Sequence, residues 1–352
     1  MQVIFFTPDL SNNSLGRTFC LWEMATELGW DSIIVSTKGD AIWGPLSNTT
    51  FARACVKLSV EEIAGSPVVL GADAFIAVKP VPESFEVASA LSADRNVPLL
   101  LDVDDPDLDS VLSWQRPVRR LAKSVIRRKQ FTRLRHLVKQ AQRTDTIVSN
   151  PVLQKRYGGS IVPHTRRDSG NGASHVSESP MVAFVGTNHS HKGLSFLREA
   201  VARLQATGFR LTITDYAPAD AKDWEVWTGP TSFVEGQSIV ANSDIVVIPS
   251  LDLPFARGQL PAKLVDAMIF GRAIVVTDIE PMPWALGSHG RVVEPGSVDA
   301  IEKALLELTD PSIRKSLGDR ARARAQEMFT VEKNVETFRH AVLTARPSTH
   351  AK

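Results

Sequence analysis

The sequence contains few cysteines and no long apolar run. Two cysteines, Cys20 and Cys55, occur in 352 residues, too few for a disulfide framework or a four-cysteine zinc site. Nowhere do about 18 uncharged apolar residues follow one another, so we expect no transmembrane helix. The first residues, MQVIFFTPDL, lack a basic leader, so we also expect no signal peptide. These absences predict a cytoplasmic chain in a reducing compartment.

Length and composition predict a globular protein of two domains. A chain of 352 residues corresponds to roughly two domains of about 150 residues each. Hydrophobic residues make up 43% of the chain and charged residues 22%, which is typical of proteins with buried cores and excludes a disordered chain.

Charge is unevenly distributed along the chain. The formal net charge is +1, but residues 116–143 contain eleven Lys or Arg and no Asp or Glu. The remainder therefore has 29 basic and 39 acidic residues, a net charge of −10. Charge concentrated in this way concerns binding partners rather than the fold.

Short runs of Val, Ile and Leu alternate with helical patterns, which indicates parallel sheets covered by helices. The expected strands are Gln2–Phe6, Ser32–Ser36, Ala74–Val78, Pro98–Val103, Thr146–Ser149, Met181–Gly186, Arg210–Thr214, Asp244–Pro249, Ala273–Thr277 and Gly290–Val293. The clearest helices are Leu15–Leu28, Glu83–Leu91, Val118–Gln142, Gly193–Ala206, Ser232–Asn242, Pro261–Phe270, Pro311–Met328 and Val331–Leu343. The fold class is therefore α/β, and the two halves predict two open α/β domains with a cleft between them.

A polar segment rich in Gly and Ser, SGNGASHVSESP, divides the chain and is typical of a linker. We expect an N-terminal domain at residues 1–168, a linker at 169–179 and a C-terminal domain at 180–330. We expect a last helix at 331–346 to pack back on the N-terminal domain. Ligands of such sheets bind beyond the carboxyl ends of the strands.

Several segments carry a family resemblance. They are FVGTNHSHKGLSFLREAVARL, NSDIVVIPS, LPAKLVDAMIFGRAIVVTDI and RVVEPGSVDAIEKALLELTDPSIRKSLGDRARARAQEMF in the second half, and DTIVSNPVLQKRYGGSIVPHTRRD in the first. In combination they resemble the group 1 family of retaining, nucleotide-sugar-dependent glycosyltransferases with two facing Rossmann-like domains, the GT-B architecture. The resemblance covers the second half densely and the first half in patches.

The resemblance implies a diphosphate site at Gly186 and Lys192. Lys192 begins a helix that follows a strand and a glycine turn, where a diphosphate would meet a cation and free helix amides. The alternative is a solvated surface lysine. The family has an arginine five residues before this lysine, where this chain has Thr187.

The resemblance also implies a donor loop, Arg257–Leu260, followed by a helix. The family carries two glutamates here, and this chain has Gly258 and Asp266 at those positions. Asp266 would accept hydrogen bonds from a ribose diol, or else be a solvated helical carboxylate. Arg257 and Lys263 are candidates for the missing cation. Gln259 and Leu260 complete the donor-binding residues that we expect.

On the acceptor side, the densest acidic stretch is LLLDVDDPDLDS. It lacks the glycine and the final glutamate of a calcium loop. Asp104 and Asp105 would instead face the cleft, orient sugar hydroxyls or take a proton; helix capping and solvation is the alternative. Gly16 lies where the family brings a glycine turn near the donor, although a helical turn explains it equally well.

We expect no resident metal or cofactor beyond the nucleoside-diphosphate sugar, which is a co-substrate. His189 and His191 lack an evident third metal ligand, and a pair of loop histidines is the simpler interpretation. The sequence has no GxGxxG motif, so an ordinary dinucleotide oxidoreductase is not indicated.

The basic stretch at 116–143 has three interpretations. Its apolar residues recur at helical spacing beneath a cationic face, as in a helix that lies on an anionic membrane surface. It would otherwise be a solvated helix face or, least expected, a nucleic-acid site, for which no recognition motif is present. A membrane-bound acceptor would suit the first interpretation and a location at the inner face of the membrane.

The resulting hypothesis is a hexosyltransferase that uses a nucleoside-diphosphate sugar. The acceptor would be a saccharide or a lipid-linked sugar, as in envelope or exopolysaccharide synthesis. Lys192, Asp104 and Asp105 are the candidate catalytic residues. The alternative is a catalytically weakened homologue that binds nucleotide sugars or serves as a partner subunit, because Thr187 and Gly258 replace two functional residues of the family.

Overall fold

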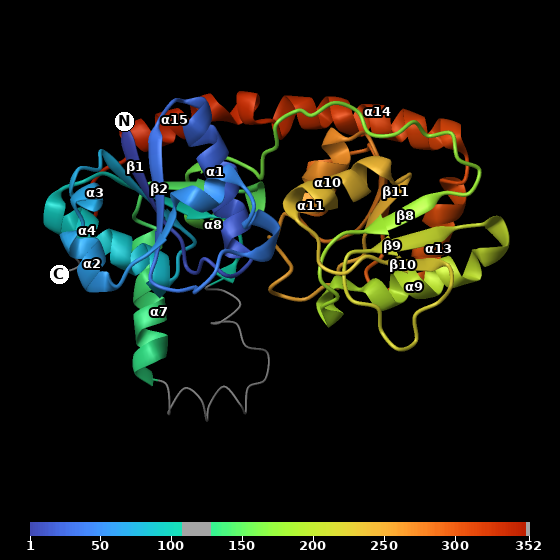
Figure 1. The fold of residues 1–352 in the computed structure, drawn as a ribbon, viewed down its shortest axis with the longest axis horizontal. Helices are drawn as coiled ribbons and strands as arrows, with labels where there is room; N and C mark the ends of the chain where they lie inside the picture. The colour runs from blue at the N-terminus through green and yellow to red at the C-terminus, as the bar shows by residue number, and fades with distance from the viewer. Residues whose placement is uncertain (108–127, 350–352) are drawn as a thin grey trace. The chain divides into compact units, whose positions relative to one another are not determined.

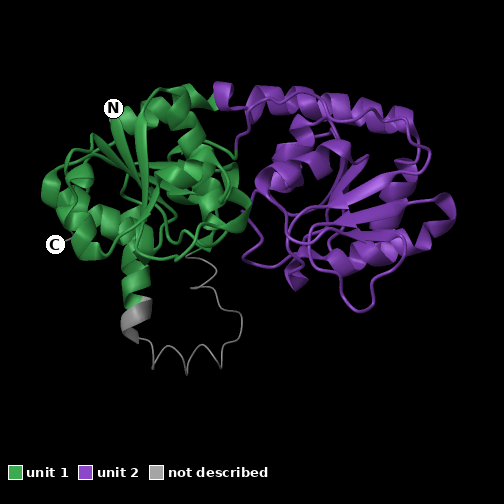
Figure 2. Ribbon diagram, viewed as in Figure 1, with its two compact units in different colours: residues 1–164, 334–352 green, residues 165–333 purple. Residues whose placement is uncertain are grey.

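A computed structural model describes residues 1–107 and 128–349 of the chain. The described residues divide into two compact units (Figure 2). One unit consists of Met1–His164 together with the C-terminal segment that begins at Asn334, and the other of Thr165–Lys333. Residues 116–127 of the basic stretch lie outside the described part.

The described residues of the first unit form a seven-stranded parallel sheet with the order β3-β2-β1-β4-β5-β6-β7 (Figure 1). Its strands are β1 (Gln2–Phe6), β2 (Asp31–Ser36), β3 (Cys55–Lys57), β4 (Ala74–Val78), β5 (Leu99–Val103), β6 (Thr146–Val148) and β7 (Ser160–Ile161). Its helices are α1 (Ser14–Glu27), α2 (Val60–Gly65), α3 (Pro67–Leu70), α4 (Val87–Arg95), α7 (Arg128–Ala141), α8 (Pro151–Tyr157) and most of α15 (Val331–Thr344).

The second unit contains a six-stranded parallel sheet with the order β10-β9-β8-β11-β12-β13. Its strands are β8 (Met181–Phe184), β9 (Arg210–Ile213), β10 (Glu225–Trp227), β11 (Ile245–Ile248), β12 (Ala273–Thr277) and β13 (Arg291–Val293). Its helices are α9 (Leu194–Arg203), α10 (Phe233–Asn242), α11 (Ala262–Ile269), α12 (Met282–Leu286), α13 (Val298–Glu307) and α14 (Pro311–Met328).

Burial on both faces explains why the central strands are almost entirely apolar. In the second unit α9 and α13 cover one face of the sheet, and α10, α11 and α14 cover the other (Figure 1). In the first unit every residue of β4 and β5 is buried, including Asp102. Parallel strands covered by helices on both sides have this composition. The predicted fold class, α/β with two Rossmann-like domains, is confirmed.

Both strand orders contain a topological switch point, where the direction of strand addition reverses. It lies between β1 and β4 in the first unit and between β8 and β11 in the second. Ligands of open α/β sheets bind in the crevice at the carboxyl ends of these strands. The loops that follow β4, β8 and β11 are therefore the first places to look for a site.

The ends of the units differ from the predicted boundaries by a few residues. The predicted first domain extends to residue 168, whereas the first unit ends at His164. Arg166 belongs to the second unit because its N–H donates to Phe329 O and its carbonyl accepts from Val331. The predicted linker is also fastened to the second unit, since the Gly172 and Ala173 amides donate to backbone carbonyls there.

The C-terminal segment is tied to the first unit. Trp30 packs against Phe338 of α15, with ring centroids 5.9 Å apart. Beyond the helix, Arg346 forms a two-pronged ion pair with Asp145, at 2.8 and 3.0 Å, and its carbonyl accepts from the Leu99 amide at the start of β5. These contacts hold the C-terminal segment against the first unit, although the residues are far apart in the sequence.

Helix α7 is the described part of the predicted basic helix. Its Leu134, Leu137 and Ala141 are buried in the core of the first unit, so its apolar face is already covered by protein. Arg135, Lys139 and Arg143 are exposed. Among the described residues, no helix is long and apolar enough to cross a membrane.

Candidate functional site

The loop after β8 brings Lys192 to the switch point of the second unit. Gly186 follows the strand with φ +148°, and a Cβ there would lie 3.1 Å from Lys192 Nζ. Gly193, with φ +67°, directly precedes α9 and lies so close to the segment after β11 that a Cβ there would be 2.0 Å from Pro249 O. The two glycines therefore let the lysine loop pack directly on the segment after β11.

Lys192 has no carboxylate partner among the described residues. Its Nζ lies 3.3 Å from Thr187 Oγ1, the residue that replaces the family's arginine. Burial lowers the pKa of Lys192; the nearby charge of Lys263 lowers it further, while that of Asp215 opposes the change. A half-buried cation of this kind favours an anionic ligand.

Asp266 is already engaged by two cations of its own unit. It is fully buried, with Arg166 Nε 2.5 Å from one carboxylate oxygen and Lys263 Nζ 3.0 Å from the other. Burial would raise the pKa of Asp266, but Arg166 and Lys263 outweigh it and lower the pKa to about 2. Both cations also lie over the Phe233 ring, at 5.2 and 5.9 Å from its centroid.

Arg166 and Phe233 were not predicted as site residues, because no motif marks either of them. Arg166 lies 100 residues from Asp266 in the sequence, and only the fold brings these residues together. Asp266 is therefore part of a buried ion-pair group rather than a solvated helical carboxylate. Lys263 is the one member of the group that is partly exposed, at 27% of its side chain.

The donor loop places its predicted residues in different surroundings. Arg257 is 64% exposed and pairs with Asp252 at 2.6 Å, so its charge is matched within its own loop. Gly258 has φ +96°, and its amide donates to Glu280 O at 2.9 Å. The Gln259 amide donates to Ala256 O, and Leu260 is buried in the core.

The two loop histidines pack against apolar and aromatic neighbours. The rings of His189 and His191 stack with their centroids 5.6 Å apart, and His191 meets Phe255, two residues before the donor loop, edge-on at 5.2 Å. The amide of Leu251 donates to His191 O at 2.8 Å. This packing joins the lysine loop to the donor loop and supports the interpretation as loop histidines.

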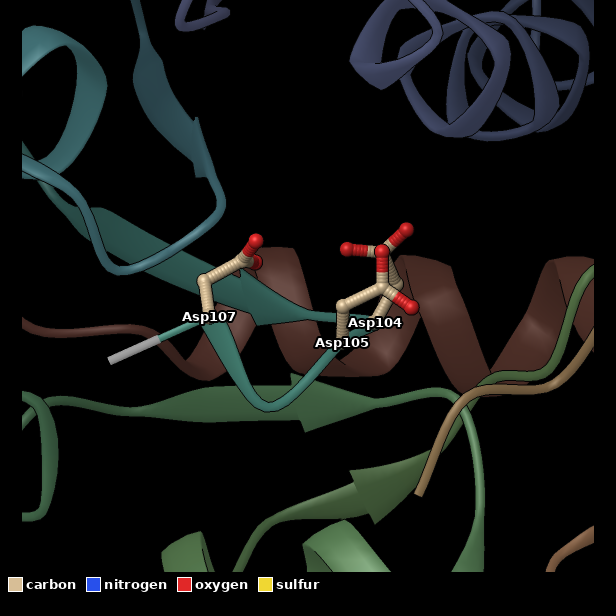
Figure 3. Close-up of side chains that lie close together, drawn as sticks. All are labelled: Asp104, Asp105 and Asp107. Atoms are coloured by element: carbon tan, nitrogen blue, oxygen red, sulfur yellow. The ribbon is translucent and has the colours of Figure 1, made fainter. Parts of the chain in front are cut away.

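In the first unit the acidic stretch surrounds a lysine that was not predicted. Lys79 follows β4 with φ +68°, a conformation that costs energy in a residue other than glycine. Its Nζ lies 3.2, 2.7 and 3.0 Å from carboxylate oxygens of Asp104, Asp105 and Asp107. Figure 3 shows these three side chains rising from one loop after β5.

The three carboxylates are close enough to hold a metal ion, since one oxygen from each lies within 4.8 Å of the others. The Lys79 ammonium group, however, contacts all three and supplies the positive charge that an ion would bring. This grouping is therefore a buried lysine with three acidic partners.

Burial has opposite results for neighbouring carboxylates of this cluster. For Asp104 the cations Lys79, His164 and Arg17 outweigh burial and lower the pKa. For Asp105 burial prevails and raises the pKa, and for Asp107 it raises the pKa to about 7. The loop thus retains a proton near neutral pH.

Asp102 and Arg17 form a second buried pair beside this cluster. Arg17 Nη2 and Nε lie 2.6 and 3.0 Å from the two oxygens of Asp102, and Arg17 also donates to the Val162 and Pro163 carbonyls. Burial raises the pKa of Asp102 to about 6 against the effect of Arg17. The neighbouring Gly16 lies inside α1, where a Cβ would be 3.3 Å from the Trp43 ring, in agreement with the helical-turn interpretation.

The comparison with protein families identifies the second unit. Residues 179–310 match the family described as "Glycosyl transferases group 1". Residues 179–310 thus form a domain of the group 1 glycosyltransferase family. The match contains the lysine loop, the donor loop and α11, so it covers the switch-point site of the second unit. The search of curated proteins found no match.

Solved structures resemble this chain over nearly its whole length. HepE of Anabaena, in a complex with UDP-glucose, has a TM-score of 0.74 and 13% identity, covering 98% of this chain and 100% of that one. Sucrose-phosphate synthase of Thermosynechococcus elongatus has a TM-score of 0.65 and 13% identity, covering 97% of this chain and 98% of that one. WaaG, a glycosyltransferase involved in lipopolysaccharide biosynthesis, has a TM-score of 0.66 and 13% identity, covering 97% of this chain and 99% of that one. At this level of identity the likeness shows the fold, the two-domain GT-B architecture.

Proposed function

We propose that the protein transfers a hexose from a nucleoside-diphosphate sugar to a hydroxyl acceptor, with retention of the anomeric configuration. The observation that carries the proposal is Lys192, a cation that has no carboxylate partner among the described residues and lies at the switch point of the domain that matches the family. UDP-glucose is the first donor to test, because HepE has been crystallised with UDP-glucose.

In the proposed reaction the bond between the anomeric carbon and the diphosphate oxygen breaks, and the diphosphate leaves with both electrons. The acceptor oxygen forms the new glycosidic bond with the anomeric carbon, and its proton passes to the departing diphosphate oxygen. Lys192, assisted by Lys263, would stabilise the charge that develops on the diphosphate. Such groups act strongly when they are held in place before the reaction and partly shielded from water.

On the acceptor side we propose that Asp104 and Asp105 orient the sugar hydroxyls. Asp105 is the more exposed of the two, at 24% of its side chain against 5% for Asp104. Lys79 holds both carboxylates, which fixes their direction. Asp105 is therefore the member that would contact an acceptor hydroxyl, with Asp104 behind it.

The acceptor is a saccharide or a lipid-linked sugar in envelope or exopolysaccharide synthesis, and the protein lies at the inner face of the membrane in this proposal. Arg135, Lys139 and Arg143 are the described cations that would face anionic lipid. Because the apolar face of α7 packs in the core, the contact would be electrostatic. It would weaken with salt, since the Debye length falls from about 10 Å at 0.1 M to about 3 Å at 1 M.

The alternative is a subunit that binds a nucleotide sugar without turnover. Thr187 in place of an arginine and the enclosure of Asp266 by Arg166 and Lys263 favour it. Hydrolysis and transfer assays with a panel of nucleotide sugars distinguish the two functions. Turnover supports the transferase, binding without turnover supports the alternative, and the absence of both contradicts the donor site itself.

A further inference from the structure

A sugar donor needs hydrogen-bond acceptors for its hydroxyl groups as well as cations for its diphosphate. Around the switch point of the second unit most carboxylates are already used. Asp266 is held by Arg166 and Lys263, and Asp252 is held by Arg257. Asp215 accepts from the amides of Asn188 and Tyr216 at 2.6 and 2.8 Å.

The segment after β12 provides carboxylates that are still free. Asp278 and Glu280 are both exposed, and neither side chain has a hydrogen-bond or ion-pair partner within the described part of the chain. They differ in how the backbone fixes them. The Asp278 amide donates to Val293 O of β13 at 2.8 Å, whereas Glu280 O accepts from the Gly258 amide of the donor loop at 2.9 Å.

A second contact ties this segment to the loop that follows β11. Thr277 Oγ1, at the end of β12, donates to Ser250 O at 2.8 Å. Since β12 pairs with β11, Ile245 with Ala273 through Ile248 with Val276, Glu280 lies beside the loop that follows β11. Of the two free carboxylates, Glu280 is the one whose own backbone is joined to the switch-point site.

Gly258 explains why a carboxylate would come from this neighbouring segment. Its φ of +96° is a conformation that side chains other than glycine rarely adopt. A glutamate at position 258 would therefore be strained unless the loop changed its backbone. Glu280, whose backbone carbonyl accepts from the Gly258 amide, is an acidic residue adjacent to the same part of the loop and requires no such strain.

We propose that Glu280 accepts hydrogen bonds from hydroxyl groups of the donor sugar and so contributes to donor selection. The assignment rests on the proposed function. A charged acceptor binds hydroxyl groups strongly, and a site built to bind a hydroxyl rejects a sugar that lacks it. Glu280 would then act on the sugar part of the donor, and the lysines on the diphosphate.

Calorimetric titrations of UDP and UDP-glucose into Glu280→Gln and Asp278→Asn test this assignment. We expect Glu280→Gln to weaken UDP-glucose binding roughly 10- to 100-fold, the range for a hydrogen bond to a charged group. UDP binding should remain unchanged, which also shows that the variant is folded. Asp278→Asn is the matched control, an exposed carboxylate two positions away, and should bind both ligands like the wild type.

Deoxy analogues of UDP-glucose sharpen the test. A missing hydroxyl that Glu280 binds should cost affinity in the wild type and little in Glu280→Gln. Equal UDP-glucose binding by Glu280→Gln and the wild type would overturn the assignment, as would an equal loss in Asp278→Asn. Failure of the wild type to bind UDP at all would overturn the proposed function, and the UDP titration distinguishes that result from failure of the Glu280 assignment alone.

Discussion

Lys79 and Lys192 each follow a strand that borders the switch point of its sheet, β4 in the first unit and β8 in the second. Lys79 is surrounded by three carboxylates at 2.7–3.2 Å. Lys192 has a threonine hydroxyl at 3.3 Å and a second lysine near enough to lower its pKa. Within the described residues, the same residue type at comparable positions therefore has carboxylate partners in one unit and none in the other.

This difference distinguishes charges that stabilise the fold from charges that can bind a ligand. A buried charge whose partners are already in place holds loops and strands together, and breaking the pair is costly. A cation without a carboxylate is compensated only when an anion arrives. In the proposed function the buried charges of the first unit mainly stabilise its own structure, whereas the second unit keeps positive charge for a ligand.

The largest expected effect is on the buried pair of the first unit. Asp102→Ala leaves the fully buried Arg17 without its counter-charge, and such a loss destabilises a protein by about 3–5 kcal/mol. Hydrogen exchange of the β4 and β5 amides should show this loss, while that of β8 and β11 should change little. Lys57→Ala, which removes the exposed pair with Asp40, is the control and should leave the exchange of these amides close to that of the wild type, because exposed ion pairs contribute little to stability.

The next effect concerns Asp266 and depends on pH. Its folded pKa of about 2 lies below the ordinary value of 3.8, so it stabilises the protein above about pH 4 and loses this contribution as the pH falls towards 2. Asp266→Asn should therefore lower the free energy of unfolding at pH 7 by about 2 kcal/mol. The difference between variant and wild type should shrink in acid. A difference independent of pH would show that the ion pairs of Asp266 contribute nothing.

A smaller effect of opposite sign is expected for Asp107. Its pKa is raised from 3.8 to about 7 by burial, so the folded wild type binds an extra proton and loses stability as the pH rises from about 4 to 7. Asp107→Asn removes this loss. Thermal unfolding at several pH values should show that the Tm of the variant rises relative to that of the wild type across this range. A Tm difference that does not change with pH would contradict the raised pKa of Asp107.

The sequence predicts the central strands well because burial on both faces requires unbroken apolar runs. β1, β4 and β12 have the predicted bounds, and α14 matches Pro311–Met328. The short edge strands β3 and β10 and the two-residue β7 were missed. Edge strands contain residues such as Lys57 and Glu225, so they lack the apolar run that marks a central strand.

Site residues were predictable only where a local motif carries them. Lys192 and Gly186 belong to one strand–loop–helix unit. The structure places them side by side, since a Cβ added at Gly186 would lie 3.1 Å from Lys192 Nζ. Lys79 and Arg166 belong to no motif; their partners Asp105 and Asp266 lie 26 and 100 residues away. Such pairings arise from the fold and cannot be predicted from spacing along the chain.

The central claim is that Lys192 is kept available for a diphosphate. It is tested most directly by calorimetric titration of UDP into the wild type, Lys192→Ala and Arg257→Ala. Lys192→Ala should lose about 1.5–3 kcal/mol of binding free energy, as for a hydrogen bond to a charged group. Arg257→Ala, which removes a cation already matched by Asp252, should bind UDP within about threefold of the wild type. Equal UDP affinity in all three proteins, or a greater loss in Arg257→Ala, would contradict the account.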